Sequence, residues 1–367
     1  MKKIVSLLVL MVTVLLLTSC GDEEYKPVAS TEQEAQTVYT IKIEDESYEV
    51  KYELYRAFFL NLKKSVDGGD ESVWTGDGKD EYINKIDALV MTQITDIYSV
   101  IHEAKKIGID PYSSDFDKKV KKYVKMGVDG GEYNGYKFEG FGGSYSKYLD
   151  SLKAENMNYS VQDLLIRYSL AYDELNYYYA GYVKNEQTGE IAGVHLEFTE
   201  ADVYDFYYSA DCVRILRAWL PLSTAKDPEA LREDMLDAAK YGDEMVRLCV
   251  GGKSQTLTAN VDNGEVFGRL SLDRVYYGEL LDAAFALEYY DVSKVITINT
   301  DMESGYSILY KLSKSSQHLN DCYDDIVEVY KQNEIGKMLE TCADKMKSAA
   351  VASNFLNGLD RASIEMQ

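Results

Sequence analysis

The sequence has 367 residues, enough for two or three domains with sizeable hydrophobic cores. Hydrophobic residues make up 46% and charged residues 28%, a balance that excludes a disordered chain. The 39 Lys and Arg against 62 Asp and Glu give a formal net charge of −23, and a field of this sign repels nucleic-acid backbones. The sequence has only 3 His, which leaves few candidate residues for a zinc cluster or a His-based catalytic triad. We therefore expect no metal, no cofactor and no nucleic-acid partner.

The first residues are typical of a bacterial lipoprotein signal peptide. Lys2 and Lys3 precede an apolar run over residues 4–17, which is too short for a comfortable transmembrane helix. The run ends in Leu-Thr-Ser-Cys-Gly, which resembles a lipobox, so we predict cleavage after residue 19 and lipidation of Cys20. An ordinary secretory signal with an incidental Cys is the alternative. The prediction places the protein at the cell membrane, lipid-anchored on the extracytoplasmic face.

Residues 21–38 are polar, small and acidic, without a periodic apolar face. This composition predicts a flexible tether that follows the lipidated cysteine and separates a folded body from the membrane.

The remaining Cys and His residues form no recognisable pattern. The spacing of the four further cysteines requires no disulfide, although an extracytoplasmic location permits them: Cys212, Cys249, Cys322 and Cys342. Cys322 and Cys342 fall in one predicted long helix, too far apart along its axis to pair with each other. The three histidines lack a partner at metal-ligand spacing and are predicted to be incidental: His102, His195 and His318.

The first half of the body predicts mainly helices. Residues 39–50 alternate between apolar and polar, which predicts a short hairpin. Apolar residues at helical spacing predict helices over 53–64, 81–106, 115–126, 144–155 and 160–183. Gly108 is a plausible stop for the second of these, and Thr199 a candidate N-cap of a further short helix.

From residue 213 the pattern changes to strands alternating with helices. Strands are predicted over 213–222, 295–299 and 306–312, helices over 228–249 and 278–287, and a Gly-containing loop over 263–273. A long helix is predicted over 319–350, with Gly336 as a weak point. The fold class is therefore α+β, a mainly helical lobe with an inserted small α/β domain.

This order resembles the PrsA/SurA family of envelope foldases, which pair a helical chaperone lobe with a parvulin-type peptidyl-prolyl isomerase domain. Residues 83–111 resemble the family's helix ending in A-x-x-x-G-I, and residues 199–208 its T-x-x-x-V-x-x-x-Y helix. Within a parvulin-like stretch over 263–312, residues 281–287 match E-x-A-A-F-A-L and residues 305–309 match G-Y-H-I-I. The resemblance implies a division into five segments: signal peptide 1–19, lipidated Cys and tether 20–38, SurA-like helical chaperone domain 39–208, parvulin-like domain 209–315 and returning C-terminal helix 316–367.

The same resemblance implies a proline pocket, but its residues differ from those of active parvulins. Arg214 stands where the first of two buried histidines is expected, and Ser307 where the second is expected. Glu265 replaces the usual Asp, Tyr276 falls where an apolar Met is common, and Phe285 is retained. An Arg cation presents a different polarity and shape to the amide that must be desolvated and twisted. Whether the domain is an enzyme is left open.

We expect a foldase or chaperone that binds unfolded or newly secreted polypeptides, with a parvulin-like domain lacking strong isomerase activity. Tyrosines offer large contact area with a polar tip, so five in the helical lobe are candidates for client contact: Tyr168, Tyr172, Tyr178, Tyr179 and Tyr182. A tyrosine stripe at helical spacing is more often part of a core than of a binding groove. A homodimer through the helical lobe is a further expectation. Two alternatives stay open: an active peptidyl-prolyl isomerase, and a solute-binding lipoprotein of a transporter.

Overall fold

The computed structural model describes residues 25–67, 70–133, 136–138, 140–180, 196–222, 227–241, 245, 264–271, 274–299 and 304–364. The chain divides into two compact units. The sheet unit is Asn176–Lys337, and the helical unit comprises the described residues before Asn176 and those from Met338 onward. The predicted signal peptide and Cys20 lie outside the described residues. Within the described ranges, no helix is long and apolar enough to cross a membrane.

The helical unit begins with the predicted hairpin and continues mainly as helices. Strand β9 pairs antiparallel with β1, so the hairpin becomes a three-stranded sheet of order β2-β1-β9. This third strand follows the last long helix and was not predicted. The elements of the unit are β1 (Thr37–Ile43), β2 (Glu46–Lys51), α1 (Tyr52–Asp67), the 3-10 helix η1 (Glu71–Trp74), α2 (Lys79–Lys106), α3 (Ser114–Asp129), β3 (Gly131–Tyr133), β4 (Tyr136–Phe138), α4 (Tyr145–Ala154), most of α5 (Tyr159–Ala180), the end of α11 (Tyr323–Ala349), β9 (Ala350–Ala352), α12 (Asn354–Gly358) and η3 (Arg361–Ser363).

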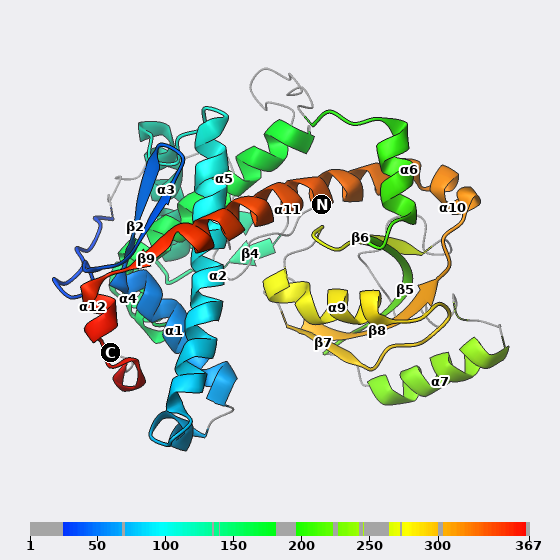
Figure 1. Ribbon diagram of the computed structural model, residues 1–367, viewed down its shortest axis with the longest axis horizontal. Helices are drawn as coiled ribbons and strands as arrows, with labels where there is room; N and C mark the ends of the chain where they lie inside the picture. Colours follow the sequence, from blue (N-terminus) through cyan, green and yellow to red (C-terminus); the bar gives the residue numbers. More distant parts are fainter. Residues whose placement is uncertain are drawn as a thin grey trace. The chain divides into compact units, whose positions relative to one another are not determined.

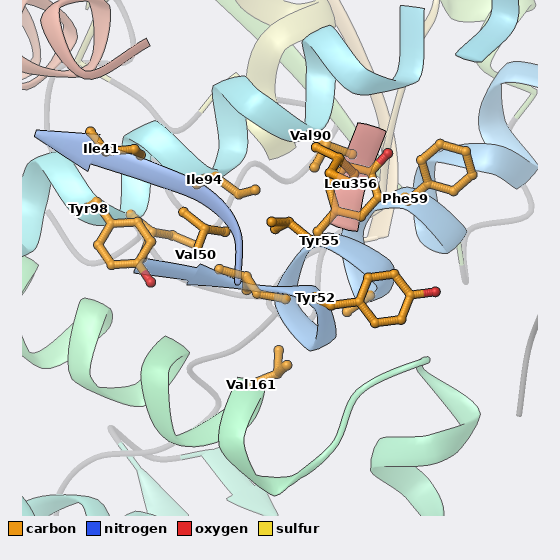
Figure 2. Packing of buried hydrophobic residues seen from close by; sticks show 14 of the residues in the cluster. Ile41, Val50, Tyr52, Tyr55, Phe59, Val90, Ile94, Tyr98, Val161 and Leu356 are labelled. Atoms are coloured by element: carbon orange, nitrogen blue, oxygen red, sulfur yellow. The ribbon is translucent and has the colours of Figure 1, made fainter. Parts of the chain in front are cut away.

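One hydrophobic core joins the hairpin, α1, α2 and the C-terminal segment of the helical unit. Ile41, Val50 and Tyr55 are 0% exposed, as are Ile94 of α2 and Leu356 of α12. Figure 2 shows Leu356 among side chains of α1 and α2. Burying a side chain of this size contributes roughly 1.5–3 kcal/mol, so the returning C-terminal segment is a structural part of the unit.

The helix boundaries follow the signals in the sequence. Gly108 adopts a φ of +86° just after α2, a left-handed conformation that glycine enters without steric cost. The Ser113 hydroxyl accepts a hydrogen bond from the Phe116 amide and caps α3. Thr199 and Asp202 form a capping box at the start of α6 (Glu200–Tyr208), which confirms the predicted N-cap.

The sheet unit is built on a four-stranded antiparallel sheet of order β6-β5-β8-β7. Two predictions about its elements were wrong. Glu265–Gly268 forms an edge strand rather than a loop, and the single long helix is interrupted at Cys322. The elements are the end of α5, α6, β5 (Cys212–Pro221), α7 (Pro228–Tyr241), β6 (Glu265–Gly268), α9 (Arg274–Ala286), β7 (Ile296–Asn299), β8 (Ser304–Leu312), α10 (Ser316–Asp321) and the first part of α11.

Each face of this sheet is covered by a helix, α9 on one side and α7 on the other (Figure 1). Successive residues of a strand point to opposite faces, and β5 follows this rule. Ile215 and Trp219 pack with Leu281 of α9, whereas Leu216 packs with Met235 of α7. We call these sides the α9 face and the α7 face.

A third hydrophobic cluster of the sheet unit joins the helix that precedes the sheet in the sequence with the two helices that follow it. Val203 and Tyr207 of α6 pack with Leu319 of α10 and Ile326 of α11. The compact unit therefore extends beyond the segment 209–315 that the sequence resemblance implies. α6 and α10 lie just outside that segment in sequence, yet their apolar side chains are buried against it.

Candidate functional site

Ser307, expected at the second histidine position, lies on the α9 face of the sheet. It stands opposite Trp219 in the register of β8 and β5. Arg217 Nε donates a hydrogen bond to Ser307 Oγ at 2.8 Å, and the Arg217 guanidinium lies 4.9 Å from the Trp219 ring centroid. Arg217 is 7% exposed and Ser307 is 0% exposed. A buried guanidinium is tolerated because a hydroxyl and an aromatic face replace part of its hydration.

Arg214, the residue expected at the first histidine position, is not beside Ser307. It stands opposite Leu312, five residues further along β8, and its Nη1 donates to the Ser313 carbonyl at 2.9 Å. Strand alternation also places it on the side opposite to Arg217. Arg217, rather than Arg214, is thus the arginine that contacts Ser307. Period-two alternation relative to Ile215 and Trp219 was the signal that could have identified Arg217.

The other residues expected in the proline pocket are Glu265, Tyr276 and Phe285, and they lie on two elements of the sheet unit, β6 and α9. Glu265 is half-buried on β6 and stands opposite Ile215. Phe285 is half-buried at the end of α9, and the Arg269 guanidinium lies 4.2 Å from its ring centroid. Tyr276 lies in α9, but its side chain is outside the described part of the structure. The Arg269 guanidinium therefore lies within cation–π range of the Phe285 ring.

Gly305, the glycine of the segment that resembles G-Y-H-I-I, lies where two strands come close together. A Cβ at this position would lie 2.3 Å from the Leu220 carbonyl oxygen and 2.9 Å from the Trp219 ring. Only glycine permits this close approach of β8 to β5. Gly305 thus helps to position Trp219, which in turn covers the Arg217 guanidinium.

These contacts limit the chemistry of the α9 face. No His lies among its described residues, and the Ser307 hydroxyl is bonded to the Arg217 guanidinium. Because Ser307 is inaccessible and Arg217 nearly so, a peptide amide cannot contact either group in this arrangement. On this face, the Arg217–Ser307 contact is buried within a hydrophobic core and closed to solvent.

The tyrosines of α5 do not form one exposed stripe. Tyr172 is 8% exposed, and Tyr168 packs half-buried against the core of the helical unit. Tyr178 and Tyr179 are half-buried, with ring centroids 5.0 Å apart, and fall in the sheet unit. Tyr182 lies outside the described residues.

Two other tyrosine pairs, which the sequence analysis missed, are exposed on the sheet unit. Tyr204 and Tyr208 of α6 are 53% and 40% exposed, with ring centroids 4.7 Å apart. Tyr289 and Tyr290 follow α9 and are 51% and 53% exposed. Arg214 interacts electrostatically with Tyr290 and with Tyr207, the neighbour of Tyr208. The i, i+4 spacing on α6 and the adjacent pair after α9 were the available signals.

Metal-ligand geometry occurs elsewhere in the described residues. His102, Glu103 and Cys342 of the helical unit bring one ligand atom each within 4.8 Å of one another. The sequence predicts His102 to be incidental because no partner stands at metal-ligand spacing. Cys342 is distant in the chain, and only the fold brings it close.

Comparison with known proteins yields distant structural similarities. No family model and no curated protein matches the sequence. Foldase protein PrsA from Streptococcus pneumoniae is similar at 16% identity, covering 87% of this chain and 97% of that chain, with a TM-score of 0.28. PrsA from Lactococcus lactis matches at 15% identity, with 87% and 95% coverage and a TM-score of 0.22. PrsA from Bacillus subtilis matches at 15%, with 74% and 87% coverage and a TM-score of 0.23. These low TM-scores establish neither the fold nor the function of this chain.

Proposed function

We propose that this chain is an extracytoplasmic chaperone of the foldase type, anchored by lipid on Cys20, which binds unfolded secreted polypeptides without catalysing prolyl isomerisation. The membrane anchor is inferred from the lipobox-like sequence around Cys20. The foldase class is inferred from the order of the motifs that resemble PrsA/SurA proteins. The binding function is inferred from one structural observation, the two exposed tyrosine pairs of the sheet unit.

The elements that carry the motifs support the foldase class. The helix that resembles the T-x-x-x-V-x-x-x-Y pattern is α6, and it directly precedes the central strand β5. Residues 281–287 lie in and just after α9, and residues 305–309 lie in β8. The matched segments are thus helix, helix and strand, as the resemblance requires.

Exposed tyrosines suit a surface that must accept many different unfolded chains. A tyrosine ring offers contact area with few rotatable bonds, and its hydroxyl tolerates water when no client is bound. Among the described residues, five of the nine exposed large hydrophobic side chains are tyrosines: Tyr112, Tyr204, Tyr208, Tyr289 and Tyr290. Lys311 Nζ lies 5.5 Å from the Tyr289 ring centroid, so a cation contacts one of these exposed rings.

The test is suppression of aggregation of a chemically unfolded secreted protein by the purified full chain, followed by light scattering. The combined change of Tyr204, Tyr208, Tyr289 and Tyr290 to Ser should weaken apparent client affinity about tenfold, which corresponds to about 1.4 kcal/mol spread over four contacts.

The matched control is Tyr112→Ser, which removes a tyrosine of 49% exposure from the helical unit. It should leave suppression close to that of the wild type. A folded fourfold variant that suppresses aggregation as well as wild type would show that client binding takes place elsewhere.

A further inference from the structure

A cluster of potential metal ligands lies where three segments of the helical unit meet. His102 and Glu103 come from the last turns of α2, and Cys342 comes from the C-terminal half of α11. The three residues are 2%, 6% and 3% exposed. Glu44 of the β1–β2 turn extends its carboxylate to 3.5 Å from His102 Nε2.

The His102 ring is oriented as a metal-ligating imidazole would be. Its Nδ1 lies 3.1 Å from the Tyr48 hydroxyl, while its Nε2 is buried and makes no hydrogen bond among the described residues. Ligating histidines commonly direct one nitrogen at the metal and bond the other to an outer oxygen, which fixes the tautomer and the ring plane. An unsatisfied buried nitrogen otherwise costs about 1–3 kcal/mol.

We propose that His102 Nε2, the Glu103 carboxylate and the Cys342 thiolate bind one Zn²⁺ ion, with the Glu44 carboxylate as the fourth ligand. This inference is independent of the proposed chaperone function.

Distances and ligand chemistry both favour zinc. Zinc bonds of about 2.0–2.3 Å place tetrahedral ligand atoms roughly 3.3–3.7 Å apart. The separation between Glu44 and His102 already matches this, and the three buried ligand atoms, all within 4.8 Å of one another, need to close by about 1 Å. One nitrogen, one sulfur and carboxylate oxygens are a set that borderline-soft Zn²⁺ accepts, whereas Mg²⁺ and Ca²⁺ prefer oxygen alone.

Metal binding would replace contacts that the ligands make with each other. Lys106 Nζ pairs with Glu103 Oε1 at 3.1 Å, and the Glu103 carboxylate also accepts a hydrogen bond from the Cys342 thiol, which the metal would replace. Burial raises the pKa of the Cys342 thiol to about 12, with the Glu103 carboxylate as a second cause, so the metal-free residue is a protonated thiol. On binding, the S–H bond breaks, the sulfur–zinc bond forms and the proton passes to solvent.

The site would join elements that only the fold brings together. β9, which pairs with β1, follows α11 directly, so a metal bound between the hairpin turn, α2 and α11 would fasten the returning C-terminal segment. We therefore expect zinc to raise the midpoint temperature of unfolding of this unit.

Zinc content after chelation and reloading tests the site. The full-length chain, purified in detergent under reducing conditions and stripped with EDTA, is reloaded with ZnCl₂ and dialysed. We expect one zinc per chain in the wild type and at least a tenfold loss of affinity in Cys342→Ser and in His102→Gln. Loading with CoCl₂ should give a sulfur-to-cobalt charge-transfer band that Cys342→Ser lacks.

The sheet unit offers matched controls, because it contains another buried Tyr–His pair and another buried cysteine that forms no disulfide. His318 Nδ1 lies 2.8 Å from the Tyr207 hydroxyl, and Cys322 is buried and outside any disulfide of the described residues. His318→Gln and Cys322→Ser should retain the zinc. Tyr48→Phe, which removes only the outer hydroxyl, should weaken zinc binding about tenfold and serves if the ligand variants do not fold.

Three results would overturn the proposal. These are wild-type zinc content no higher than that of Cys342→Ser, a cobalt spectrum without the sulfur band, or equal loss of zinc in Cys322→Ser.

Discussion

Arg217 and Ser307 show how a polar pair can be kept in a hydrophobic core. Each group has the other as a hydrogen-bond partner, and the Trp219 ring covers the guanidinium. Removal of Arg217 would take away the donor that bonds the buried Ser307 hydroxyl. The same burial keeps a peptide from contacting either group. At the scale of single residues, this position therefore favours a structural role over catalysis.

His318 is the residue whose protonation should make stability depend on pH. Burial lowers its pKa from the ordinary 6.5 to about 4, and the Arg214 cation acts in the same direction, while Asp321 and Asp325 oppose it. The unfolded imidazole takes up a proton near pH 6.5, but the folded one does so only near pH 4. Its contribution is thus complete above pH 6.5 and is lost as the pH falls towards 4.

We expect the free energy of unfolding to fall by about 1–2 kcal/mol more in the wild type than in His318→Gln between pH 7 and pH 4. Urea unfolding at several pH values measures this difference. Parallel pH profiles for the two proteins would contradict the assignment, because the carboxylates that titrate in this range are common to both.

At the scale of elements, Gly336 marks a close approach between two segments rather than a weak point of a helix. Gly336 lies inside α11, where a Cβ would come within 2.6 Å of the Leu270 carbonyl oxygen and 2.7 Å of the Leu270 Cβ. The residue that the sequence analysis took for a weakness in the helix is the contact that lets α11 meet the turn after β6.

Gly336→Ala should therefore destabilise the sheet unit by about 1–2 kcal/mol, since overpacking of roughly 1–3 kcal/mol outweighs a helix-propensity gain of up to about 1 kcal/mol. Gly278→Ala is the matched control, because it also lies within a helix but has no atom within 4 Å of the added Cβ. It should stabilise by about 0.5–1 kcal/mol. Equal effects of the two changes in urea unfolding would refute the packing argument.

At the scale of the whole molecule, the closed α9 face predicts the absence of catalysis. The barrier to isomerisation of a peptide bond is about 18–20 kcal/mol, and lowering it requires an accessible pocket that desolvates and twists the amide. In the presence of the full chain, the prolyl bond of a test peptide should isomerise between cis and trans at its uncatalysed rate. An active parvulin serves as the positive control. Circular dichroism must show that the chain is folded. Catalysis that disappears in Phe285→Ala would reverse this conclusion.

Local patterns predicted most elements because helices and strands impose their periods on neighbouring residues. The spacing of Ile83, Ile86 and Val90 is enough to identify α2, and its end follows from Gly108. The interruption at Cys322 was missed because neither Pro nor Gly stands there. β9 was missed because three residues carry too short a pattern, and its partner strand lies near the other end of the chain.

The contacts of the candidate site could not be predicted from the sequence, because they depend on how strands pair. Which of Arg214 and Arg217 stands beside Ser307 depends on the register between β5 and β8, and a shift of one residue reverses the face. The exposure of Tyr204 and the burial of Tyr172 likewise depend on what packs against each helix.

The amino-acid sequence by itself determined the α+β class, the helices and strands with a clear period, and the expectation of a lipid anchor at Cys20. These properties depend on composition and on residues close together in the chain. Tertiary structure alone decided that Arg217 meets Ser307 and that His102 and Glu103 meet Cys342. Such contacts depend on strand register and helix packing, which join residues that no local pattern relates.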